Sequence, residues 1–344
     1  MLPPHLANDP PTRERFLREA RTAAQLSHPS IVPVHRADET KNAVYFVMAF
    51  VSVRVALVTC AELPAADADT RLLIEPLAAL GIDAKPAVWD DAAVAWEQFD
   101  LAVVRSCWDY LYRREEFLAW AARVPRLANA HDVLAWNTDK RYLRELGAQG
   151  VAVVPTQWIA PQDSWLLPRQ GEWVIKPAVS LSSLGAGRYD LDDATQHHLA
   201  AAHVERLQEA GRTVMLQQYL RAIDSEGETS LIYIEGAFSH AVRRAAVLTG
   251  PDMGLDKRFA GAEARHEVVE RGTEVQLRLA DRALAAVPSD EVLLYARVDL
   301  VPGADSAPVL MELELSEPSL FLGYAAGAPA RFARAIAGVA RRLR

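Results

Sequence analysis

Two apolar segments near the C-terminal end of the chain each carry a pair of charged residues two positions apart. Arg297 and Asp299 form the first pair, and Glu312 and Glu314 form the second. Because successive side chains of a β-strand point to opposite faces, the members of each pair share one face. A hairpin in which Arg297 lies opposite Glu312 would bring all four side chains to the same side.

Three carboxylates gathered beside one arginine would repel each other strongly in a buried site. Magnesium takes hard oxygen ligands and bridges nucleotide phosphates, and an arginine can contact a phosphate oxygen. The same residues could instead lie on a solvated strand face and form cross-strand ion pairs. The pattern by itself leaves a magnesium–phosphate site and an ion-paired surface as equal alternatives.

A lysine at the end of another apolar segment is followed by a loop of small residues. Lys176 lies in the segment 173–177, and the loop 180–187 contains Ser182, Ser183 and two glycines. Small residues let backbone amides approach a phosphate group, and serine hydroxyls add hydrogen-bond donors. A mobile surface loop has the same composition, so the loop alone leaves both interpretations open.

The segments between residues 53 and 123 alternate between strand and helix patterns. The continuous apolar run 53–60 is typical of a buried parallel strand. Further strands are predicted at 83–89 and 99–106, and helices at 70–80 and 113–123. This order predicts a doubly wound, open parallel sheet. No G-x-G-x-x-G motif follows the first strand, which disfavours a nicotinamide cofactor.

Further helices and strands are predicted from residue 136 onwards, and among them are the strands that carry Lys176 and the two charged pairs. Residues 136–140 are predicted to open a helix that ends near 147–150, with Asn137 or Thr138 as its cap. The elements predicted beyond it are strand 173–177, helix 193–210, strand 213–219, strands 228–235 and 237–244, helix 273–287, strands 292–301 and 309–315, and a final basic helix.

The composition is that of a globular protein with room for two or three subdomains, since 51% of the 344 residues are hydrophobic and 24% are charged. A net charge of -8 argues against nucleic acid and against an anionic membrane as partners. The two cysteines, Cys60 and Cys107, show no metal-binding spacing, which favours a reduced, cytoplasmic location. Neither a signal peptide nor a membrane span is predicted.

The first 51 residues form a segment that differs from the rest. An amphipathic helix is predicted at 12–26, where Phe16, Leu17 and Ala20 recur at helical spacing. Short strands are predicted at 31–34 and 44–51.

This segment resembles the N-lobe of bacterial serine/threonine kinases through residues 16–21, 26–34 and 45–48. The resemblance implies that Glu19 corresponds to the glutamate that pairs with the ATP lysine. The lysine strand, the Gly-rich loop and the His-Arg-Asp and Asp-Phe-Gly motifs are all missing, so kinase activity is not expected. We expect a truncated α+β fragment left by gene fusion or by an incorrectly assigned start, rather than a regulatory module.

From about residue 53 to the C-terminus, the chain resembles the ATP-grasp superfamily. The similar branch contains glutathione-synthetase-like and ribosomal-protein-glutamate-ligase-like enzymes, including the cyclo-ligase of D-cycloserine biosynthesis. Nine short segments in the family's order carry the resemblance, and they are 105–110, 136–143, 154–156, 174–177, 217–220, 226–231, 238–242, 296–299 and 312–318.

The resemblance implies an α/β ATP-grasp fold with an open parallel-sheet domain at 53–135, a central subdomain at 136–220 and a C-terminal subdomain at 221–344. It also implies that Lys140 and Lys176 hold the phosphates of ATP. The hinge whose backbone meets the adenine would consist of Gln217, Gln218, Tyr219 and Leu220.

The resemblance assigns the two charged pairs to phosphate and metal. Arg297 would contact phosphate or an acyl-phosphate, and Asp299, Glu312 and Glu314 would ligate Mg²⁺. Glu228 would lie near the ribose or the metal. Many relatives carry asparagine at the position of Glu314, so a glutamate there keeps an oxygen ligand but adds charge.

The implied reaction joins a carboxylate to an amine, or closes a ring, on a small amino-acid-like substrate. The carboxylate would attack the terminal phosphate of ATP, and the nucleophile would then displace phosphate from the acyl-phosphate. The alternative is a non-catalytic nucleotide-binding sensor or interaction protein. Relatives often pair, so a homodimer is an expected assembly, although no segment indicates an interface.

The residues that bind the substrate are the part of the site for which the sequence gives the weakest indication. Arg105, Trp108 and Asp109 lie at the C-terminal end of a predicted strand of the open sheet, where ligands usually bind. His240 and Arg243 lie on a later strand and are further candidates. For each of these residues, a structural or solvated role is the alternative.

Overall fold

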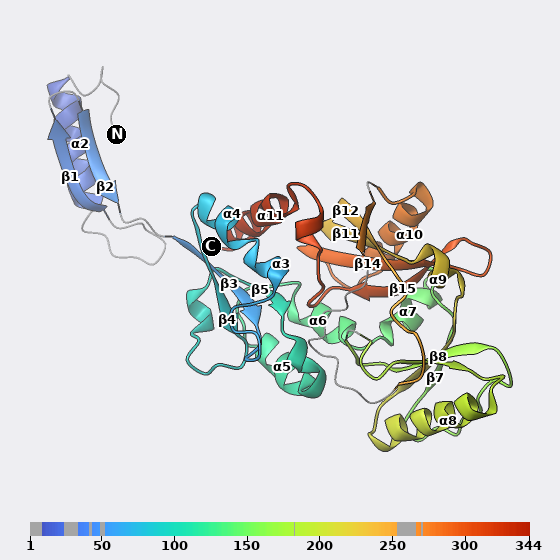
Figure 1. The fold of residues 1–344 in the computed structure, drawn as a ribbon. Coiled ribbons are helices and arrows are strands. Elements are labelled where there is room, and N and C mark those ends of the chain that lie inside the picture. Colours follow the sequence, from blue (N-terminus) through green and yellow to red (C-terminus); the bar gives the residue numbers. More distant parts are fainter. Residues whose placement is uncertain are drawn as a thin grey trace. The chain divides into compact units, whose positions relative to one another are not determined.

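The computed structural model describes residues 9–23, 34–40, 43–48, 52–181, 183–252, 266–269 and 271–344 (Figure 1). The chain divides into two compact units, Met1–Val53 and Arg54–Arg344. Within the described parts of the chain, no helix is both long enough and apolar enough to cross a membrane.

The smaller unit contains, in its described residues, a helix and a two-stranded antiparallel hairpin. Helix α2 (Pro10–Ala23) begins before residue 12 because the Asp9 carboxylate accepts a hydrogen bond from the Thr12 amide at 3.1 Å. The strands are β1 (Val34–Thr40) and β2 (Ala43–Met48). Of the predicted strand at 31–34 only Val34 is described, and it begins β1, which pairing with β2 extends to residue 40.

The kinase-like residue Glu19 forms an ion pair with Arg15 at 2.8 Å, one helical turn away on α2. Both side chains are well exposed, so the pair contributes little to stability. The predicted features at 24–33 and 49–51 lie outside the described residues.

The first sheet of the larger unit confirms the predicted open parallel sheet. Its strands in spatial order are β4 (Ile82–Val88), β3 (Val53–Thr59), β5 (Leu101–Ser106) and β6 (Leu127–Ala128). β3 pairs in parallel with β5, and β5 pairs in parallel with β6. β5 is buried along its whole length, as a strand covered on both faces must be.

The predicted single helix at 70–80 is wrong, because two short helices replace it. They are α3 (Ala68–Arg71) and α4 (Ile74–Ala79). Pro76 lies in the first turn of α4 and has no amide hydrogen to donate to the preceding turn, so a continuous helix would lose a bond there. The predicted helix at 113–123 is confirmed as α5 (Arg114–Ala121), which follows a 3₁₀ turn, η2 (Trp108–Tyr112).

The predicted helix opening at 136–140 is also wrong. Residues 131–137 form α6 (His131–Asn137), and a new helix, α7 (Tyr142–Ala148), begins after a break. At this break the Lys140 amide donates to the carbonyl of Ala178 at 2.9 Å, instead of to a helical carbonyl. Neither predicted residue caps α7, because Asn137 ends α6 and its amide side chain bonds elsewhere.

The central sheet is antiparallel, with its strands in the order β7 (Thr156–Ile159), β10 (Val214–Gln218), β8 (Glu172–Pro177) and β9 (Gly187–Asp190). Helix α8 (Ala194–Glu209) packs against β8, β9 and β10. The helix starts after Asp193, whose carboxylate accepts hydrogen bonds from two amides of the first turn. The predicted elements in this region are confirmed.

One buried histidine of α8 gives the fold a pH-dependent contribution. His203 is completely buried, and its Nδ1 atom lies 2.8 Å from the Tyr189 hydroxyl. Its Nε2 atom is 3.6 Å from a carboxylate oxygen of Asp252. Burial lowers the pKa of His203 from 6.5 to about 4; Arg206 adds to this shift and Asp252 opposes it. The histidine is therefore neutral in the folded protein at pH 5, whereas the unfolded chain binds a proton there.

We expect the free energy of unfolding to fall by about 2 kcal/mol between pH 7 and pH 5 through His203 alone. The contribution is complete above the unfolded pKa of 6.5 and is lost as the pH falls towards 4. Urea unfolding at both pH values measures it, and His203→Gln should reduce the pH dependence by that amount. His198→Gln, on an exposed position of α8, is the control. An unchanged pH dependence in His203→Gln would contradict the prediction.

The C-terminal sheet is antiparallel and has five described strands. Their order is β13 (His266–Val269), β12 (Ala237–Arg244), β11 (Glu228–Ile234), β14 (Tyr295–Pro302) and β15 (Pro308–Glu314). Helix α10 (Glu274–Ala285) packs against β15, and α11 (Ala328–Arg342) packs against α4 and β11. The short helix α9 (Ala222–Glu226) leads into β11, and η3 (Leu322–Tyr324) precedes α11.

Gly227, between α9 and β11, occupies the left-handed region with a φ of 73°. A Cβ atom at this position would lie 2.5 Å from the carbonyl oxygen of Arg244. Only glycine allows β12 to approach so closely, which brings Glu228 beside Arg244 at the start of β11. The strands of each of the three sheets formed by β3 to β15 fall within one of the ranges 53–135, 136–220 and 221–344, but these subdomain boundaries remain a prediction.

Candidate active site

The hairpin of β14 and β15 carries both charged pairs, in a register that differs from the predicted one. Arg297 pairs with Glu314, and Asp299 pairs with Glu312. The prediction that Arg297 lies opposite Glu312 is therefore wrong. Directly paired residues of an antiparallel hairpin share a face, so the expectation that all four side chains gather on one side is confirmed.

A β-bulge explains the difference in register. Asp299 pairs with Glu312 but the next residue, Leu300, pairs with Leu310, so Met311 is the extra residue of the bulge. Leu310 is fully buried in the core, while Met311 lines a cavity. Met311 faces the cavity because the extra residue reverses the alternation of side chains along β15.

Arg297 is tied to the carboxylates on both sides of it. Its Nε and Nη2 atoms donate to the two carboxylate oxygens of Asp299, each at 2.9 Å, and Nη2 also donates to Glu314. Asp299 is almost completely buried and accepts a further hydrogen bond from Ser230 at 2.7 Å. Arg297 and Glu314 line the cavity, and Asp299 lies behind this wall.

A second arginine, Arg244, completes the cluster. Its Nη2 atom donates to Glu228 and, at 3.1 Å, to Asp299. Arg244 ends β12 opposite Glu228, the first residue of β11. Spacing along the chain did not assign it to this cluster, since its place depends on the pairing of β11 with β12.

Burial raises the pKa of Glu228 and that of Glu314 to about 7, although Arg244 and Arg297 respectively oppose the shift. Burial also opposes ionisation of Asp299, but Arg297 and Arg244 outweigh it and lower the pKa of that carboxyl. Two carboxyl groups that resist ionisation would gain from an added positive charge. This set of hard oxygen donors therefore fits a divalent cation such as Mg²⁺.

Two lysines from different elements complete the cationic part of the cavity. Lys140 Nζ donates to the carbonyl of Ser180 at 2.6 Å and pairs with Glu312 at 3.0 Å. Lys176 lies on β8, and burial lowers its pKa even though Glu312 opposes the shift. Among the described residues, no acceptor is within hydrogen-bond distance of Lys176 Nζ. A buried ammonium without an acceptor is suited to an anionic ligand.

These groups face a cavity of about 580 Å³, within the size range of small-molecule sites. The predicted phosphate and metal residues that line it are Lys140, Lys176, Glu228, Arg297, Glu312 and Glu314. The other predicted residues on its wall are Trp108, Ser183, Gln217, Gln218, Tyr219 and Leu220. Ser182 lies outside the described residues.

The hinge end of the cavity has apolar walls. Val154, Val174 and Ile223 pack with Tyr219 in one apolar cluster beside β10. Gln217 Nε2 donates to the Thr156 hydroxyl at 2.8 Å, which fixes the end of β10. An apolar slot at the edge of a strand suits a flat heteroaromatic ring such as adenine.

Four of the five predicted substrate residues do not line the cavity. Asp109 accepts hydrogen bonds from Trp89 at 2.9 Å and from Arg113 at 2.5 Å. Arg105 is buried beneath the chain that follows β15, and His240 Nε2 lies 2.9 Å from the carbonyl of Leu320. Arg243 has an exposed side chain on β12. Only Trp108 is on the cavity wall, so direct substrate contact by the other four remains a prediction.

Three residues without a predicted role in the site anchor the chain around the second charged pair. Asn137 donates to the Leu313 carbonyl and accepts from the Leu315 amide, each at 2.7 Å. Asn129 donates to the Leu315 carbonyl at 2.7 Å. Asp69 accepts from the amides of Leu320 and Leu322 at 2.8 and 2.9 Å. Such contacts hold β15 and the loop after it against the first sheet.

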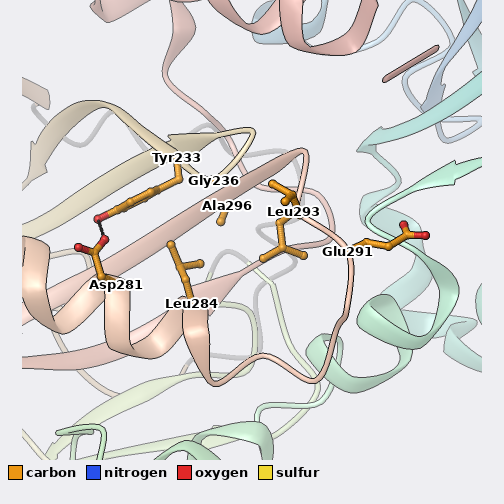
Figure 2. Close-up of a pocket in the computed structure, with 8 residues that line it drawn as sticks. Tyr233, Gly236, Asp281, Leu284, Glu291, Leu293 and Ala296 are labelled. Atoms are coloured by element: carbon orange, nitrogen blue, oxygen red, sulfur yellow. Dashed lines mark hydrogen bonds between the residues drawn. The ribbon is translucent and has the colours of Figure 1, made fainter. Parts of the chain in front are cut away.

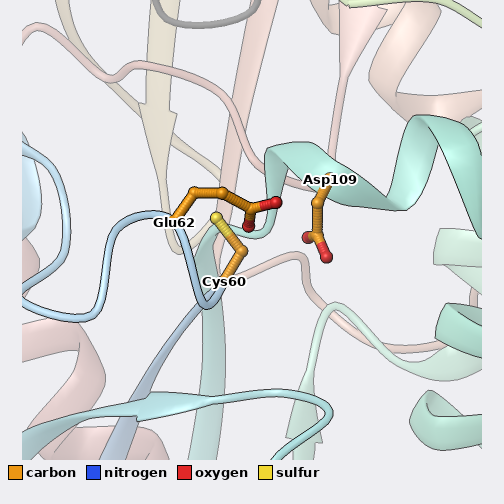
Figure 3. Close-up of side chains that lie close together, drawn as sticks. All are labelled: Cys60, Glu62 and Asp109. Carbon is orange, nitrogen blue, oxygen red and sulfur yellow. The ribbon is translucent and has the colours of Figure 1, made fainter.

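Two smaller features lie outside this cavity. A pocket of about 460 Å³ lies on the α10 side of the sheet, where the Tyr233 hydroxyl donates to Asp281 at 3.0 Å. Figure 2 draws the side chains that line this pocket. Figure 3 shows the side chains of Cys60, Glu62 and Asp109. The sulfur atom of Cys60 and one carboxylate oxygen of each acidic residue, which are atoms able to bind a metal ion, lie within 4.8 Å of one another. Asp109 is already bonded to Trp89 and Arg113, and burial raises the pKa of the Cys60 thiol.

Comparison with solved structures defines the class of protein. The crystal structure of D-cycloserine synthetase DcsG has a TM-score of 0.74 and 36% identity, covering 85% of this chain and 100% of that chain. The ATP-grasp ligase PsnB, complexed with a minimal precursor, Mg and ADP, has the same fold at a TM-score of 0.53 and 20% identity, covering 84% and 97%. The larger unit has the ATP-grasp fold, as predicted.

Comparison of sequences then defines the family. The family described as D-cycloserine synthetase DcsG, N-terminal domain, matches residues 55–129. Cycloserine biosynthesis protein DcsG of Streptomyces lavendulae is 36% identical over 295 residues, covering 82% of this chain and 97% of the relative. The chain belongs to the DcsG family of ATP-grasp ligases.

A short part of the chain is similar to a kinase. Over 46 residues it is 48% identical to the serine/threonine-protein kinase PknD of Chlamydia pneumoniae. The match covers 13% of this chain and 5% of the kinase. It therefore supports similarity to a fragment of the kinase and does not indicate kinase activity.

Proposed function

We propose that this chain is an ATP- and magnesium-dependent ligase that joins a carboxylate to an amine on a small amino-acid-like substrate. One observation carries the proposal. A single cavity wall combines Lys140, Lys176 and Arg297 with Glu312 and Glu314. This combination can neutralise a polyphosphate and hold a metal beside it, as transfer of a phosphoryl group requires.

Each group has a role that follows from its position. The hinge 217–220 would receive the adenine, and the two lysines would hold the phosphates. Glu312 and Glu314 would hold Mg²⁺, which commonly takes one or two protein carboxylates together with phosphate oxygens. When bound, the metal neutralises charge on the phosphates. Arg297 would orient the oxygens of the transferred phosphoryl group, because Asp299 fixes its guanidinium from behind.

The proposed reaction has two steps. A carboxylate oxygen of the substrate attacks the terminal phosphorus of ATP, and the bond from that phosphorus to ADP breaks. The nitrogen of an amine then attacks the carbonyl carbon of the acyl-phosphate, and phosphate leaves as the nitrogen loses a proton. The protein contributes orientation and charge neutralisation, so no nucleophilic side chain is required.

The family narrows the substrate class. The Streptomyces relative is named a cycloserine biosynthesis protein, and the solved relative is named a D-cycloserine synthetase. These names support an amino-acid-like substrate and a reaction in which carboxylate and nucleophile can belong to one molecule. A cyclising ligase is therefore included in the proposal.

Release of ADP and phosphate from Mg-ATP, in the presence of pools of amino acids and hydroxy acids, tests the proposed function. We expect wild-type protein to release both products in a way that depends on at least one pool. The matched control omits the pool and measures background hydrolysis of ATP. Binding of ATP without pool-dependent release would favour a nucleotide sensor over a ligase.

A further inference from the structure

Glu317 has no assigned role, yet its environment is unusual for a carboxyl group. It lies in the loop after β15, only 6% of it is exposed, and it lines the cavity. Its Oε2 atom is buried and has no hydrogen-bond partner among the described residues. A buried acceptor left without a donor is costly, so its retention at a cavity wall points to a ligand.

The loop holds Glu317 in place from both sides. The Tyr295 hydroxyl donates to the carbonyl of Ser316 at 2.7 Å, and Arg105 Nη2 donates to the carbonyl of Pro318 at 2.8 Å. Both donors are nearly completely buried. The backbone is thus held by a buried hydrogen bond on each side of Glu317. Arg105 thereby holds the backbone next to Glu317.

The charge around Glu317 is not balanced by an ion pair. Glu228, Glu312 and Glu314 pair with Arg244, Lys140 and Arg297 respectively, whereas no ion pair forms with Glu317 among the described residues. Burial raises the pKa of Glu317 to about 8 and Glu314 adds to the shift, while a hydrogen bond from the Tyr110 hydroxyl and the charge of Lys140 oppose it. A cationic ligand would supply the missing charge.

The position of Glu317 separates it from the nucleotide end of the cavity. Tyr110 belongs to η2, the same turn that places Trp108 on the cavity wall. Glu317 therefore lies where the first sheet meets the hairpin, whereas the hinge at 217–220 belongs to the central sheet. A substrate between these two regions would lie beside Glu317 at one end and beside the phosphates at the other.

We propose that Glu317 binds the amino group of the substrate, and so selects amino acids over the corresponding hydroxy acids. This inference rests on the proposed ligase function. An ammonium group donates up to three hydrogen bonds and can use the free Oε2 atom, whereas a hydroxyl donates one and brings no charge. The alternative is that Glu317 and Tyr110 form a purely structural pair.

Calorimetric titration of the full chain, saturated with Mg²⁺ and a non-hydrolysable ATP analogue, tests the proposal. The probes are serine and glycerate, in both enantiomers, because they differ only by an amino or hydroxyl group. We expect wild-type protein to bind one serine enantiomer at least about tenfold more tightly than the matching glycerate. Glu317→Gln should lose this preference, and Glu317→Asp should keep part of it.

Binding of the ATP analogue should change less than about twofold in Glu317→Gln, which also shows that the variant is folded. Glu291→Gln, at an exposed position, is the matched control. Equal binding of serine and glycerate by the wild type, or a preference that survives in Glu317→Gln, would overturn the inference.

The ADP-release assay separates this inference from the proposed function. Pool-dependent release by wild-type protein without an amino preference keeps the ligase and overturns the role of Glu317. A Glu317-dependent amino preference without release from any pool keeps the amine site and overturns the ligase.

Discussion

Replacing Glu312 with glutamine is expected to lower the rate of pool-dependent ADP release by about 10²- to 10³-fold. The carboxylate faces the cavity and pairs with Lys140 Nζ at 3.0 Å. The amide keeps the size and one oxygen but removes the charge that would hold a metal against the phosphates. Initial rates at saturating Mg-ATP, with the pool that supports wild-type release, measure the effect.

A matched control separates this charge effect from a general loss of structure. Glu115→Gln removes a carboxylate that is 91% exposed on the first turn of α5, so it should release ADP at the wild-type rate. Thermal unfolding of both variants checks that they are folded. Wild-type rates in Glu312→Gln would remove Glu312 from the proposed metal site.

Replacing Lys176 with alanine is expected to weaken binding of Mg-ATP by about 100-fold. Its ammonium is buried on β8 and has no acceptor within hydrogen-bond distance among the described residues, so a phosphate oxygen is its expected partner. Burial lowers the pKa of Lys176, which means that the charged form is unfavourable in the empty cavity. Alanine removes this cost together with the phosphate contact.

We therefore expect Lys176→Ala to have different effects on the unfolding temperature without nucleotide and on the increase in that temperature when Mg-ATP is added. Without nucleotide, Lys176→Ala should unfold at the same temperature as the wild type or at a higher one. The increase in unfolding temperature on addition of Mg-ATP should be strongly reduced. Lys85→Ala removes an exposed lysine of β4 and should leave both quantities unchanged. A full stabilisation of Lys176→Ala by Mg-ATP would show that this lysine does not hold the phosphates.

The sequence determined the features that depend on neighbouring residues. The alternation of side chains along a strand put Arg297 on the same face as Asp299, and Glu312 on the same face as Glu314, before any strand pairing was known. The order of strands and helices between 53 and 123 indicated the parallel sheet, and the parallel pairing of β3 with β5 confirms it. The nine segments in family order indicated the ATP-grasp fold, which the comparisons confirm.

Tertiary structure decided the contacts between segments that are distant in the chain. The bulge at Met311 set the hairpin register, and the approach of β12 to β11 at Gly227 placed Arg244 among the carboxylates. The sequence alone did not reveal these features, because strand pairing depends on which packing buries the most apolar surface and satisfies the most hydrogen bonds. The contacts of Arg105 are another feature that the sequence alone did not reveal. Its position at the end of a strand suggested substrate binding, but Pro318, its hydrogen-bond partner, lies 213 positions further along the chain, and only folding brings the two together.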